Sequence, residues 1–349
     1  TVRWHRALAP WSLGLIGAHI VFIVVGYALS EKTSVLGQLW ALVAHTRWVL
    51  PAVAGFLLLL MAAVTSYRLV RNRLAYETWW IIHLYTYLGV VLAFTHQVML
   101  GNAFVGRSVA TDLWLGLTAA ALGSLRVFRW LLPLVRGLRH GLRVHAVVDE
   151  GPDTVSVWLT GRRLARLTAR GGQFFAWRFL TRELWWHANP YSLSAPPDGR
   201  YLRITVKQTG DHSAAVRSLT PGTRVIAEGP YGAFTAQRRH GDHVVLVAGG
   251  VGVTAVRALL EELPHDAAVD VIYRARRHSD VVLQSELDQL AQRPSTTLHY
   301  LVGSREEHPM DADSLLRLAP RIKDSDVFVC GPESLRQQVR QAATALGVP

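Results

Sequence analysis

Four long stretches within the first 140 residues are almost free of charged side chains. They are Trp11 to Leu29, Trp48 to Tyr67, Thr78 to Gly106 and about Leu113 to Val135. A helix needs roughly 20 apolar residues to cross a bilayer core about 30 Å thick, and the first three stretches carry no Asp, Glu, Lys or Arg. Arg126 and Arg129 interrupt the fourth. Such helices could also be buried in a large soluble protein, but four in succession predict a helical membrane domain over residues 1–140.

The pattern changes after residue 140 to short alternating strands separated by Gly, Pro and Asp. They are Val144–Val148, Thr154–Thr160, Gln173–Trp177, Tyr201–Lys207 and Arg224–Glu228. Regularly spaced short strands are typical of a small antiparallel barrel, which we expect over residues 141–238. From His243 strands and helices alternate, and the apolar run Val244–Val247 indicates a strand buried on both faces of a parallel sheet. The predicted fold class is a multidomain membrane protein with an all-α bundle, an antiparallel β-barrel and an α/β parallel-sheet domain over residues 239–349.

The basic residues add an orientation to this picture. The 349-residue chain has a formal charge of +12, and many of its arginines lie beside the apolar stretches, which favours a membrane protein over a partner of nucleic acid. They are Arg3, Arg6, Arg68, Arg71, Arg73, Arg126, Arg129, Arg136, Arg139 and Arg143. By the positive-inside rule the N-terminus and everything after residue 140 are cytoplasmic, and the first and third helices run in the same direction. We expect an integral protein of a bacterial plasma membrane.

Four histidines lie on the first and third of these helices, at two depths. His5 and His19 are 14 residues apart, a rise of about 21 Å on one face, whereas His83 and His96 are 13 apart, a rise of about 19.5 Å. Because the helices are parallel, His5 pairs in depth with His83, and His19 with His96, so each pair could ligate one b-type haem. Residues 13 apart differ by about 140°, which requires a π or 3₁₀ irregularity or a haem approached from a different side. Alternatively, one or two of these histidines, His5 above all, simply lie at an interface.

Three further segments suit the binding of nucleotides. Gly249, Gly250, Gly252 and Thr254 separate a strand from a helix, where glycines let the backbone approach a pyrophosphate. Arg274 and Arg276 follow the next strand, and Arg305 follows Tyr300–Ser304. No acidic residue stands at the end of this strand to bind a ribose 2′-hydroxyl, and arginines suit a 2′-phosphate, so the sequence favours NADPH over NADH. Solvated surface charge explains at least one of these arginines. The third segment is Lys207 with Gly210, Asp211, His212 and Ser213, which lead into a helix whose amides favour an anion, although alone they form an ordinary helix cap.

In their order along the chain these motifs resemble those of ferric reductases and NADPH oxidases. Trp4-His5-Arg6 with His19, His83 and His96 is similar to their transmembrane haem domain, and Asn189-Pro190-Tyr191-Ser192 is similar to the flavin motif of the ferredoxin-reductase superfamily. The resemblance implies that Tyr191 stacks on the isoalloxazine of FAD, that Ser192 bonds near its N5, and that the segment from Lys207 to Ser213 holds its pyrophosphate. Asn189 stands where relatives have Arg or His.

The end of the chain carries a second part of the resemblance. Cys330-Gly331-Pro332 is similar to the segment that places a thiol near the nicotinamide, although Cys330 could equally be a small buried hydrophobe. Cys330 is the only cysteine, which excludes an intrachain disulfide. The family's membrane domain usually has six helices, so the resemblance implies that the first two are absent here, and the start at Thr1 suggests a fragment or a trimmed chain. Relatives cover the flavin with an aromatic residue beyond this last helix, and the resemblance implies that this residue is absent here too.

The resemblance implies an NAD(P)H-dependent transmembrane oxidoreductase. Hydride is expected to pass from NADPH to FAD, and single electrons through the His5/His83 haem and then the His19/His96 haem to an acceptor on the outer side. Molecular oxygen, giving superoxide, and ferric iron are the expected acceptors. The alternatives are a haem–quinone or partner-protein electron-transfer module, and a flavin reductase that is not embedded in a membrane.

Overall fold

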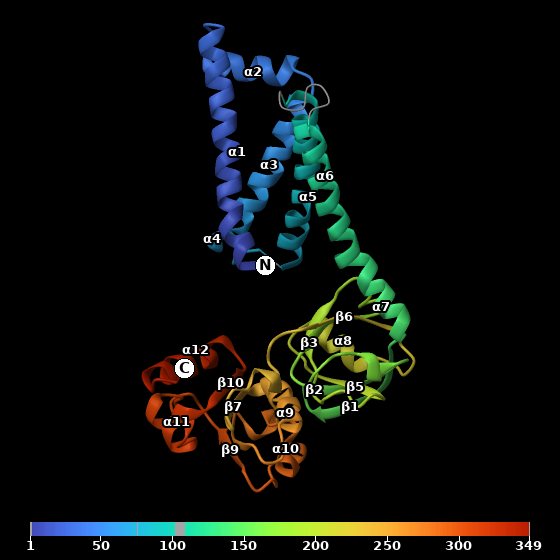
Figure 1. Ribbon diagram of the computed structural model, residues 1–349, viewed down its shortest axis with the longest axis vertical. Coiled ribbons are helices and arrows are strands. Elements are labelled where there is room, and N and C mark those ends of the chain that lie inside the picture. The colour runs from blue at the N-terminus through green and yellow to red at the C-terminus, as the bar shows by residue number, and fades with distance from the viewer. Residues whose placement is uncertain (1, 75, 102–108, 349) are drawn as a thin grey trace. The chain divides into compact units, whose positions relative to one another are not determined.

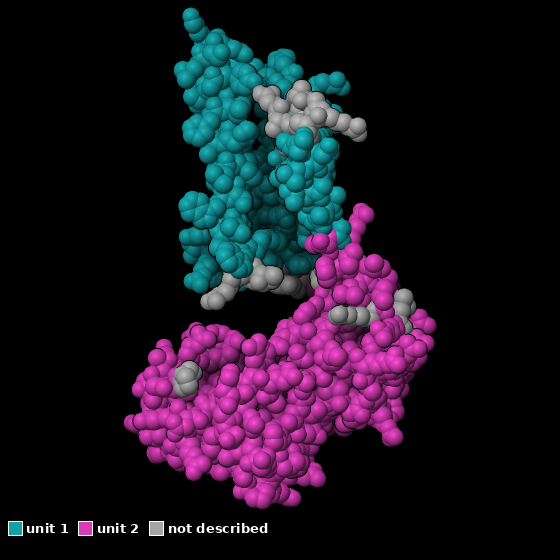
Figure 2. All heavy atoms as spheres, in the orientation of Figure 1, with its two compact units in different colours: residues 1–123 teal, residues 124–349 magenta. Residues whose placement is uncertain are grey.

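The computed structural model describes residues 2–74, 76–101 and 109–348, so residues 102–106 of the third predicted stretch lie outside the described residues. The side chains of Arg3, Arg129 and Arg136, which contributed to the predicted orientation, also lie outside them. The chain forms two compact units, residues 1–123 and residues 124–349 (Figure 2).

Helices make up the first unit (Figure 1). They are α1 (Val2–Ser30), α2 (Val35–His45), α3 (Val49–Ser66), α4 (Arg68–Arg71), α5 (Tyr76–Leu100) and the start of α6 (Val109–Arg126). Among the described residues three helices are long and apolar enough to cross a membrane, namely Trp4–Ser30, Val49–Ser66 and Thr78–Leu100. Phe22 and Leu29 each leave 75% of their surface exposed, which suits lipid better than water. The first three predicted stretches are therefore confirmed as apolar helices; the fourth is helical as α6 but is not among the three.

Helices α3 and α5 approach each other at two glycines. A Cβ atom on Gly55 would lie 2.7 Å from the carbonyl oxygen of Gly89, and one on Gly89 would lie 2.9 Å from that of Gly55. Any larger residue would push the helices apart, because small residues are what allow two membrane helices to pack backbone to backbone. This contact fixes α5, which carries His83 and His96.

The helix that carries these two histidines is regular. α5 is α-helical from Tyr76 to Leu100, without the π or 3₁₀ irregularity that could have turned His83 and His96 to one face. If both histidines bind haem, the two haems must therefore approach α5 from different sides. In the described residues the π turn lies at Val127–Leu131, between α6 and α7 (Leu132–His140). Gly141 ends α7 in the left-handed conformation that favours glycine, with φ +51°.

Two three-stranded antiparallel sheets follow, in what we call the antiparallel half (residues 143–238). One has the order β1 (Arg143–Gly151), β2 (Thr154–Thr160), β5 (Tyr201–Lys207); the other has the order β4 (Asn189–Ser192), β3 (Phe174–Phe179), β6 (Val225–Tyr231). Isolated bridges join Arg143 to Arg224 and Leu193 to Ile204. Alternate residues of both sheets, among them Val157, Phe175, Trp177 and Ile204, are fully buried in one shared core, as expected for strands with one apolar face each.

A four-stranded parallel sheet forms the remainder, which we call the parallel half (residues 243–348). Its order is β10 (Asp326–Cys330), β7 (His243–Gly249), β8 (Ala268–Ala275), β9 (Thr296–Val302). Val244 and Leu246 pack with α9 (Val253–Glu262) and α10 (Gln284–Leu290). Val245 and Val247 point to the other face, toward α11 (Ala312–Leu318) and α12 (Glu333–Ala345). Helices thus cover both faces (Figure 1), which explains the continuously apolar β7 and confirms the predicted parallel sheet.

Short helical turns complete the second unit. They are α8 (Asp211–Ala215) and the 3₁₀ turns Leu164–Arg166, Val216–Ser218, Ala236–Arg238, Gly250–Gly252, His278–Asp280 and Ile322–Asp324.

Candidate functional site

The carboxyl edge of the parallel sheet gathers three of the predicted nucleotide segments. In the strand register Cys330 lies beside Ala248, Ala248 beside Tyr273, and Gly249 beside Arg274. Loops at this edge of an open parallel sheet are where α/β proteins bind their ligands. The glycine loop, Arg274 and Cys330 therefore border one site although they lie far apart in the sequence.

Two of the loop glycines are required by contacts within the protein. A Cβ atom on Gly252 would overlap the carbonyl oxygen of Cys330, and one on Gly249 would lie 2.6 Å from Cδ2 of Leu335. Gly250 has no atom near its missing Cβ, but its φ of +54° strains any residue with a side chain. The hydroxyl of Thr254 donates to the carbonyl oxygen of Val251 at 3.0 Å. The loop is therefore held by the neighbouring segment Cys330-Gly331 and by its own turn, with Gly250 the position open to a ligand.

The predicted arginines differ in exposure. Arg274 is buried and donates from Nη2 to the carbonyl oxygen of Ser304 at 3.2 Å. Burial and then the positive charge of Arg305 lower the pKa of Arg274, so the two guanidinium groups are close enough to repel each other. Arg305 and Arg276 are both exposed. The ends of β8 and β9 thus concentrate positive charge, as a phosphate site requires.

The Cys330 thiol is half-buried at the end of β10. Burial raises its pKa, and Arg336 acts in the opposite sense. The thiol is therefore protonated at neutral pH, which suits a neutral neighbour of a reacting ring and not a nucleophile. Gly331 and Pro332 follow directly and lead into α12.

The predicted flavin motif forms β4 in the antiparallel half. Its Tyr191 pairs with Phe175 of β3, and Trp177 donates from Nε1 to the Tyr191 carbonyl oxygen at 2.9 Å. Burial raises the pKa of Tyr191, so its phenol is neutral at physiological pH. Pro190 is exposed, whereas Asn189 and Ser192 are half-buried. The strand is thus fixed through its backbone, and its side chains alternate between the two faces.

The predicted anion segment is engaged mainly within the protein. Lys207 places Nζ 2.9 Å from Oδ1 of Asp280 in the parallel half. The Ser213 hydroxyl accepts hydrogen bonds from the amides of Thr209 (2.8 Å) and Gly210 (3.0 Å), which closes the turn before Asp211. The segment therefore forms the ordinary helix cap that the sequence analysis gave as the alternative to an anion site.

An aromatic cluster beside this segment was not predicted. The ring centroid of His212 lies 4.4 Å from that of His187 and 5.3 Å from that of Trp186. Trp186 and His187 lie three and two residues before Asn189 in the sequence, so their proximity to the Asn189–Ser192 motif was a signal that could have been used. The cluster thus brings two residues that precede the predicted flavin motif into contact with His212 of the predicted anion segment.

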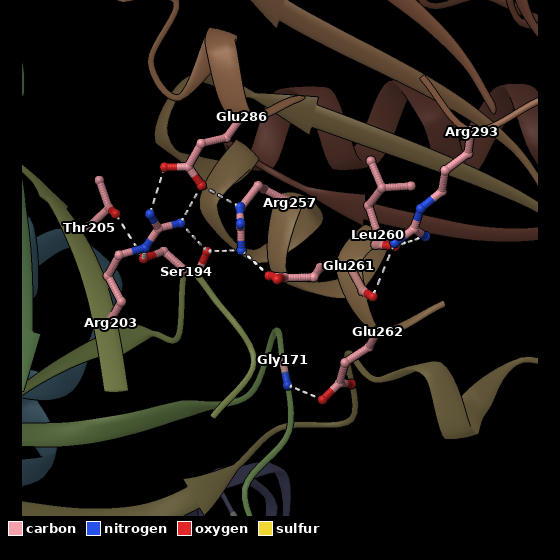
Figure 3. Close-up of polar contacts among 10 residues, drawn as sticks. All are labelled: Gly171, Ser194, Arg203, Thr205, Arg257, Leu260, Glu261, Glu262, Glu286 and Arg293. Atoms are coloured by element: carbon pink, nitrogen blue, oxygen red, sulfur yellow. Dashed lines mark hydrogen bonds and ion pairs between the residues drawn. The ribbon is translucent and has the colours of Figure 1, made fainter. Parts of the chain in front are cut away.

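A buried polar network between the two halves was also missed. Arg203 and Ser194 of the antiparallel half meet Arg257 and Glu286 of the parallel half (Figure 3). Arg203 and Glu286 are 83 residues apart, and charged residues with such spacing have no local pattern that pairs them.

In the helical unit the structure brings His5 and His83 together. Their ring centroids are 6.0 Å apart and the ring planes are perpendicular, at 89°. The pair therefore offers two adjacent imidazoles that could hold one haem iron. His83 also stacks on Trp79 at 5.0 Å, and its buried Nδ1 has no hydrogen-bond partner in the described part of the chain.

The second pair is less closely assembled. His96 likewise has a buried Nδ1 with no hydrogen-bond partner among the described residues, whereas His19 is exposed on α1. The described part of the chain shows no ring contact between them, and within it no cluster of three or more His, Cys, Asp or Glu could hold a metal ion. The predicted role of His96 as a haem ligand is therefore supported by its unpaired Nδ1 alone.

Comparisons with known proteins follow this division of the chain. A family model described as "Ferric reductase like transmembrane component" matches residues 1–94, and one described as "Oxidoreductase NAD-binding domain" matches residues 246–341. Ferredoxin–NADP reductase B of Sorangium cellulosum (strain So ce56) is 31% identical over 179 residues, which cover 46% of this chain and 73% of that protein. The chain thus carries a ferric reductase-like transmembrane region at its N-terminus and a module that belongs with the ferredoxin–NADP reductases.

Two further relatives each match a little under half of the chain. A flavohemoprotein of Burkholderia sp. (strain TH2) is 31% identical over 46% of this chain and 44% of its own length. The plasma membrane-associated coenzyme Q6 reductase of Saccharomyces cerevisiae (strain ATCC 204508 / S288c) is 29% identical over 44% of this chain and 54% of its own length. The chain thus spans about half the length of these curated relatives.

Solved structures agree on the fold of the module. The FAD/NAD-binding domain of nitric oxide dioxygenase from Vibrio cholerae O1 biovar El Tor aligns with a TM-score of 0.51 at 23% identity, over 60% of this chain and 95% of that one. The predicted resemblance is confirmed for the transmembrane region and for the NAD-binding domain, and the described residues contain three helices long and apolar enough to cross a membrane.

Proposed function

We propose that this protein carries electrons from cytoplasmic NADPH through FAD and two b-type haems to an acceptor on the outer side of the membrane. The observation that carries the proposal is the His5/His83 pair, because two apolar helices bring its rings to a separation that suits one haem. The division that we propose is a haem domain over residues 1–140, an FAD barrel over 141–238 and an NADP domain over 239–349.

The haem ligands are His5 with His83 and His19 with His96. Haem iron held by two histidines supplies a one-electron carrier without an open coordination site. Trp79 stacks on His83 and donates from its Nε1 to the Ser66 hydroxyl at 3.1 Å, so it holds the His83 ring against α3. Imidazoles are costly in a bilayer unless they bind something, and the unpaired Nδ1 atoms of His83 and His96 agree with a ligand role.

The flavin site lies on β4, in the two sheets that we propose act together as the family's flavin-binding barrel. Bound FAD supplies the conversion between two-electron hydride chemistry and one-electron transfer. Tyr191 offers a neutral ring for stacking and Ser192 a hydroxyl, while Lys207 and the segment 210–213 would hold the pyrophosphate. Trp186 and His187 extend this surface through their contact with His212. Lys207 pairs with Asp280, and because an ammonium group has three donors it can bind a phosphate as well.

The nucleotide site lies at the edge of the parallel sheet. Gly250 presents its backbone, and the amides at the start of α9 favour a pyrophosphate. Arg274 and Arg305 favour the 2′-phosphate that distinguishes NADPH from NADH, with Arg276 as a further contact. Cys330, followed by Gly331 and Pro332, supports the nicotinamide with a neutral thiol.

The acceptor that we propose is molecular oxygen or ferric iron. The alternative is a haem–quinone or partner-protein module, and similarity to a relative named a coenzyme Q6 reductase favours the quinone form of it. Turnover of the purified protein with oxygen alone supports the first proposal, whereas turnover that requires added quinone supports the second.

The test is an optical spectrum of detergent-purified protein reconstituted with haem and FAD, before and after anaerobic addition of NADPH. We expect low-spin b-type bands that NADPH reduces, and loss of roughly half the haem in His83→Ala, because one of two sites is removed. His45→Ala is the matched control, since His45 lies exposed at the end of α2. Haem binding that survives replacement of all four histidines would overturn the haem assignment.

A further inference from the structure

The carboxylate of Glu286 lies between two arginines that come from different elements (Figure 3). Arg203 of β5 approaches it with both terminal nitrogens, Nη1 to Oε1 at 2.6 Å and Nη2 to Oε2 at 2.9 Å. Arg257 of α9 places Nε 2.7 Å from Oε2, close enough for an ion pair but not aligned as a hydrogen bond. The Arg203 contact is therefore the bidentate one, and it joins the antiparallel half to the parallel half.

The same arginines hold Ser194. Arg203 donates from Nε to the Ser194 hydroxyl at 3.1 Å and from Nη2 to its carbonyl oxygen at 2.9 Å. Arg257 donates from Nη1 to the same carbonyl oxygen at 3.3 Å. Thr205 adds a bond from its hydroxyl to the Ser194 hydroxyl at 2.8 Å. Ser194 is fully buried, so this position has no solvent to replace these donors.

The cluster lies next to both proposed cofactor segments. Ser194 is two residues beyond Ser192 of the flavin motif, and Arg257 is three residues beyond Thr254 of the glycine loop. A displacement of either half at this cluster therefore moves a cofactor-binding segment directly. The Arg203 side chain is 4% exposed and that of Glu286 28%, so water cannot readily take over the contact.

Stability alone is a poor reason for such a cluster. The cost of removing ions from water offsets much of their attraction, and apolar residues of similar volume often stabilise a protein as well. What a bidentate pair with fixed geometry adds is a defined separation of the two groups that it joins. Hydride transfer requires such a separation, because reacting atoms must approach to about 3–3.5 Å, and an error of about 1 Å can cost on the order of 100-fold in rate.

We propose that Arg203, Glu286 and Arg257 are positioning residues that set the distance between the flavin motif and the nucleotide loop for hydride transfer. This inference rests on the proposed function, in which FAD and NADPH occupy these two segments. None of the three residues touches a reacting atom. They act through Ser194 and through the start of α9.

The test compares Glu286→Gln with Glu261→Gln in the full-length, FAD-loaded protein. Glu261 pairs with the same Arg257, but within α9 and not across the two halves. Rapid-mixing absorbance with NADPH, under anaerobic conditions, gives the rate of flavin reduction at saturation and the apparent Kd of NADPH. For Glu286→Gln we expect a rate about 10- to 100-fold lower, an NADPH Kd changed less than about threefold, and a larger isotope effect with deuterated NADPH. For Glu261→Gln we expect a rate within about twofold of the unmodified protein.

Other outcomes separate the possible explanations. A cluster that only stabilises the fold would lower the melting temperature and the fraction of protein that holds FAD, but would leave the reduction rate per bound FAD unchanged, and that result overturns the inference. Equal losses in the two variants also overturn it. If Glu286→Gln does not fold, Arg203→Lys keeps the charge but loses the bidentate contact, and an unchanged rate there overturns the inference as well. An unmodified protein that binds no FAD, or whose bound flavin NADPH does not reduce, contradicts the proposed function instead.

Discussion

The environment of Cys330 defines what its thiol can do. Its half-buried position raises its pKa, despite Arg336 nearby, so little of the reactive thiolate is present at pH 7–8. We expect iodoacetamide to modify Cys330 several-fold more slowly in the folded protein than in the denatured protein at the same pH. Mass spectrometry of the labelled peptide over time measures both rates. Because Cys330 is the only cysteine, no other thiol contributes to the signal.

Two outcomes of this labelling are informative. Further slowing by NADP⁺ supports a position of Cys330 beside the bound nucleotide. Labelling as fast as in the denatured chain would contradict both the buried thiol and its neutral state.

At the scale of elements, the turn that begins α9 requires a glycine at position 252. A Cβ atom on Gly252 would overlap the Cys330 carbonyl oxygen, and backbone at that point has no flexible end that could move away. We expect Gly252→Ala to destabilise the second unit by about 1–3 kcal/mol, which lowers its Tm by roughly 2–10 °C, and to weaken NADPH binding. Thermal unfolding followed by intrinsic fluorescence gives the first value and NADPH titration the second.

A matched glycine lies just before β7. Gly241 has only ordinary contacts, with its nearest neighbour 3.7 Å from a Cβ atom placed there, so Gly241→Ala should change stability by less than about 0.5 kcal/mol. Equal losses in the two variants would mean that the crowding at Gly252 is not what makes glycine necessary.

At the scale of the whole molecule, ion pairs between the two halves of the second unit make its stability depend on acid. Burial raises the pKa of Glu286, but the hydrogen bonds of Arg203 and the positive charges of Arg203 and Arg257 outweigh it and leave the pKa below the usual value. A bond from Lys207 lowers the pKa of Asp280. Groups with a lowered pKa stabilise the fold above about pH 4, where the unfolded carboxylates are ionised, and lose this contribution as pH falls through the folded pKa.

We therefore expect the Tm advantage of the unmodified protein over Glu286→Gln to be constant from pH 7 to about pH 5 and to shrink below about pH 4. Thermal unfolding of both proteins across this range is the measurement. Burial raises the pKa of Glu262 and of Asp270, which acts in the opposite sense in both proteins and so cancels in the difference. A Tm difference that stays constant down to pH 3 would contradict the assignment of this acid sensitivity to Glu286.

Features set by short-range periodicity could be predicted from the sequence. The uncharged runs predicted α1, α3 and α5, and the run Val244–Val247 predicted a strand covered on both faces. The glycine loop was also recognised, but the reason for Gly252 was not, because its neighbour Cys330 is 78 residues away. The Arg203–Glu286 contact was missed for the same reason. Patterns within one element can be read from sequence, whereas contacts that depend on how elements pack cannot.

The contact between Gly55 and Gly89 has a mechanical consequence for the membrane helices. Gly89 lies six residues after His83 and seven before His96, so the contact with α3 is near the midpoint of the helical segment that joins the two histidines. A tilt of α5 about this point would move the two imidazoles in opposite directions. A substitution that alters the tilt of α5 would therefore affect both of the proposed haem sites at once.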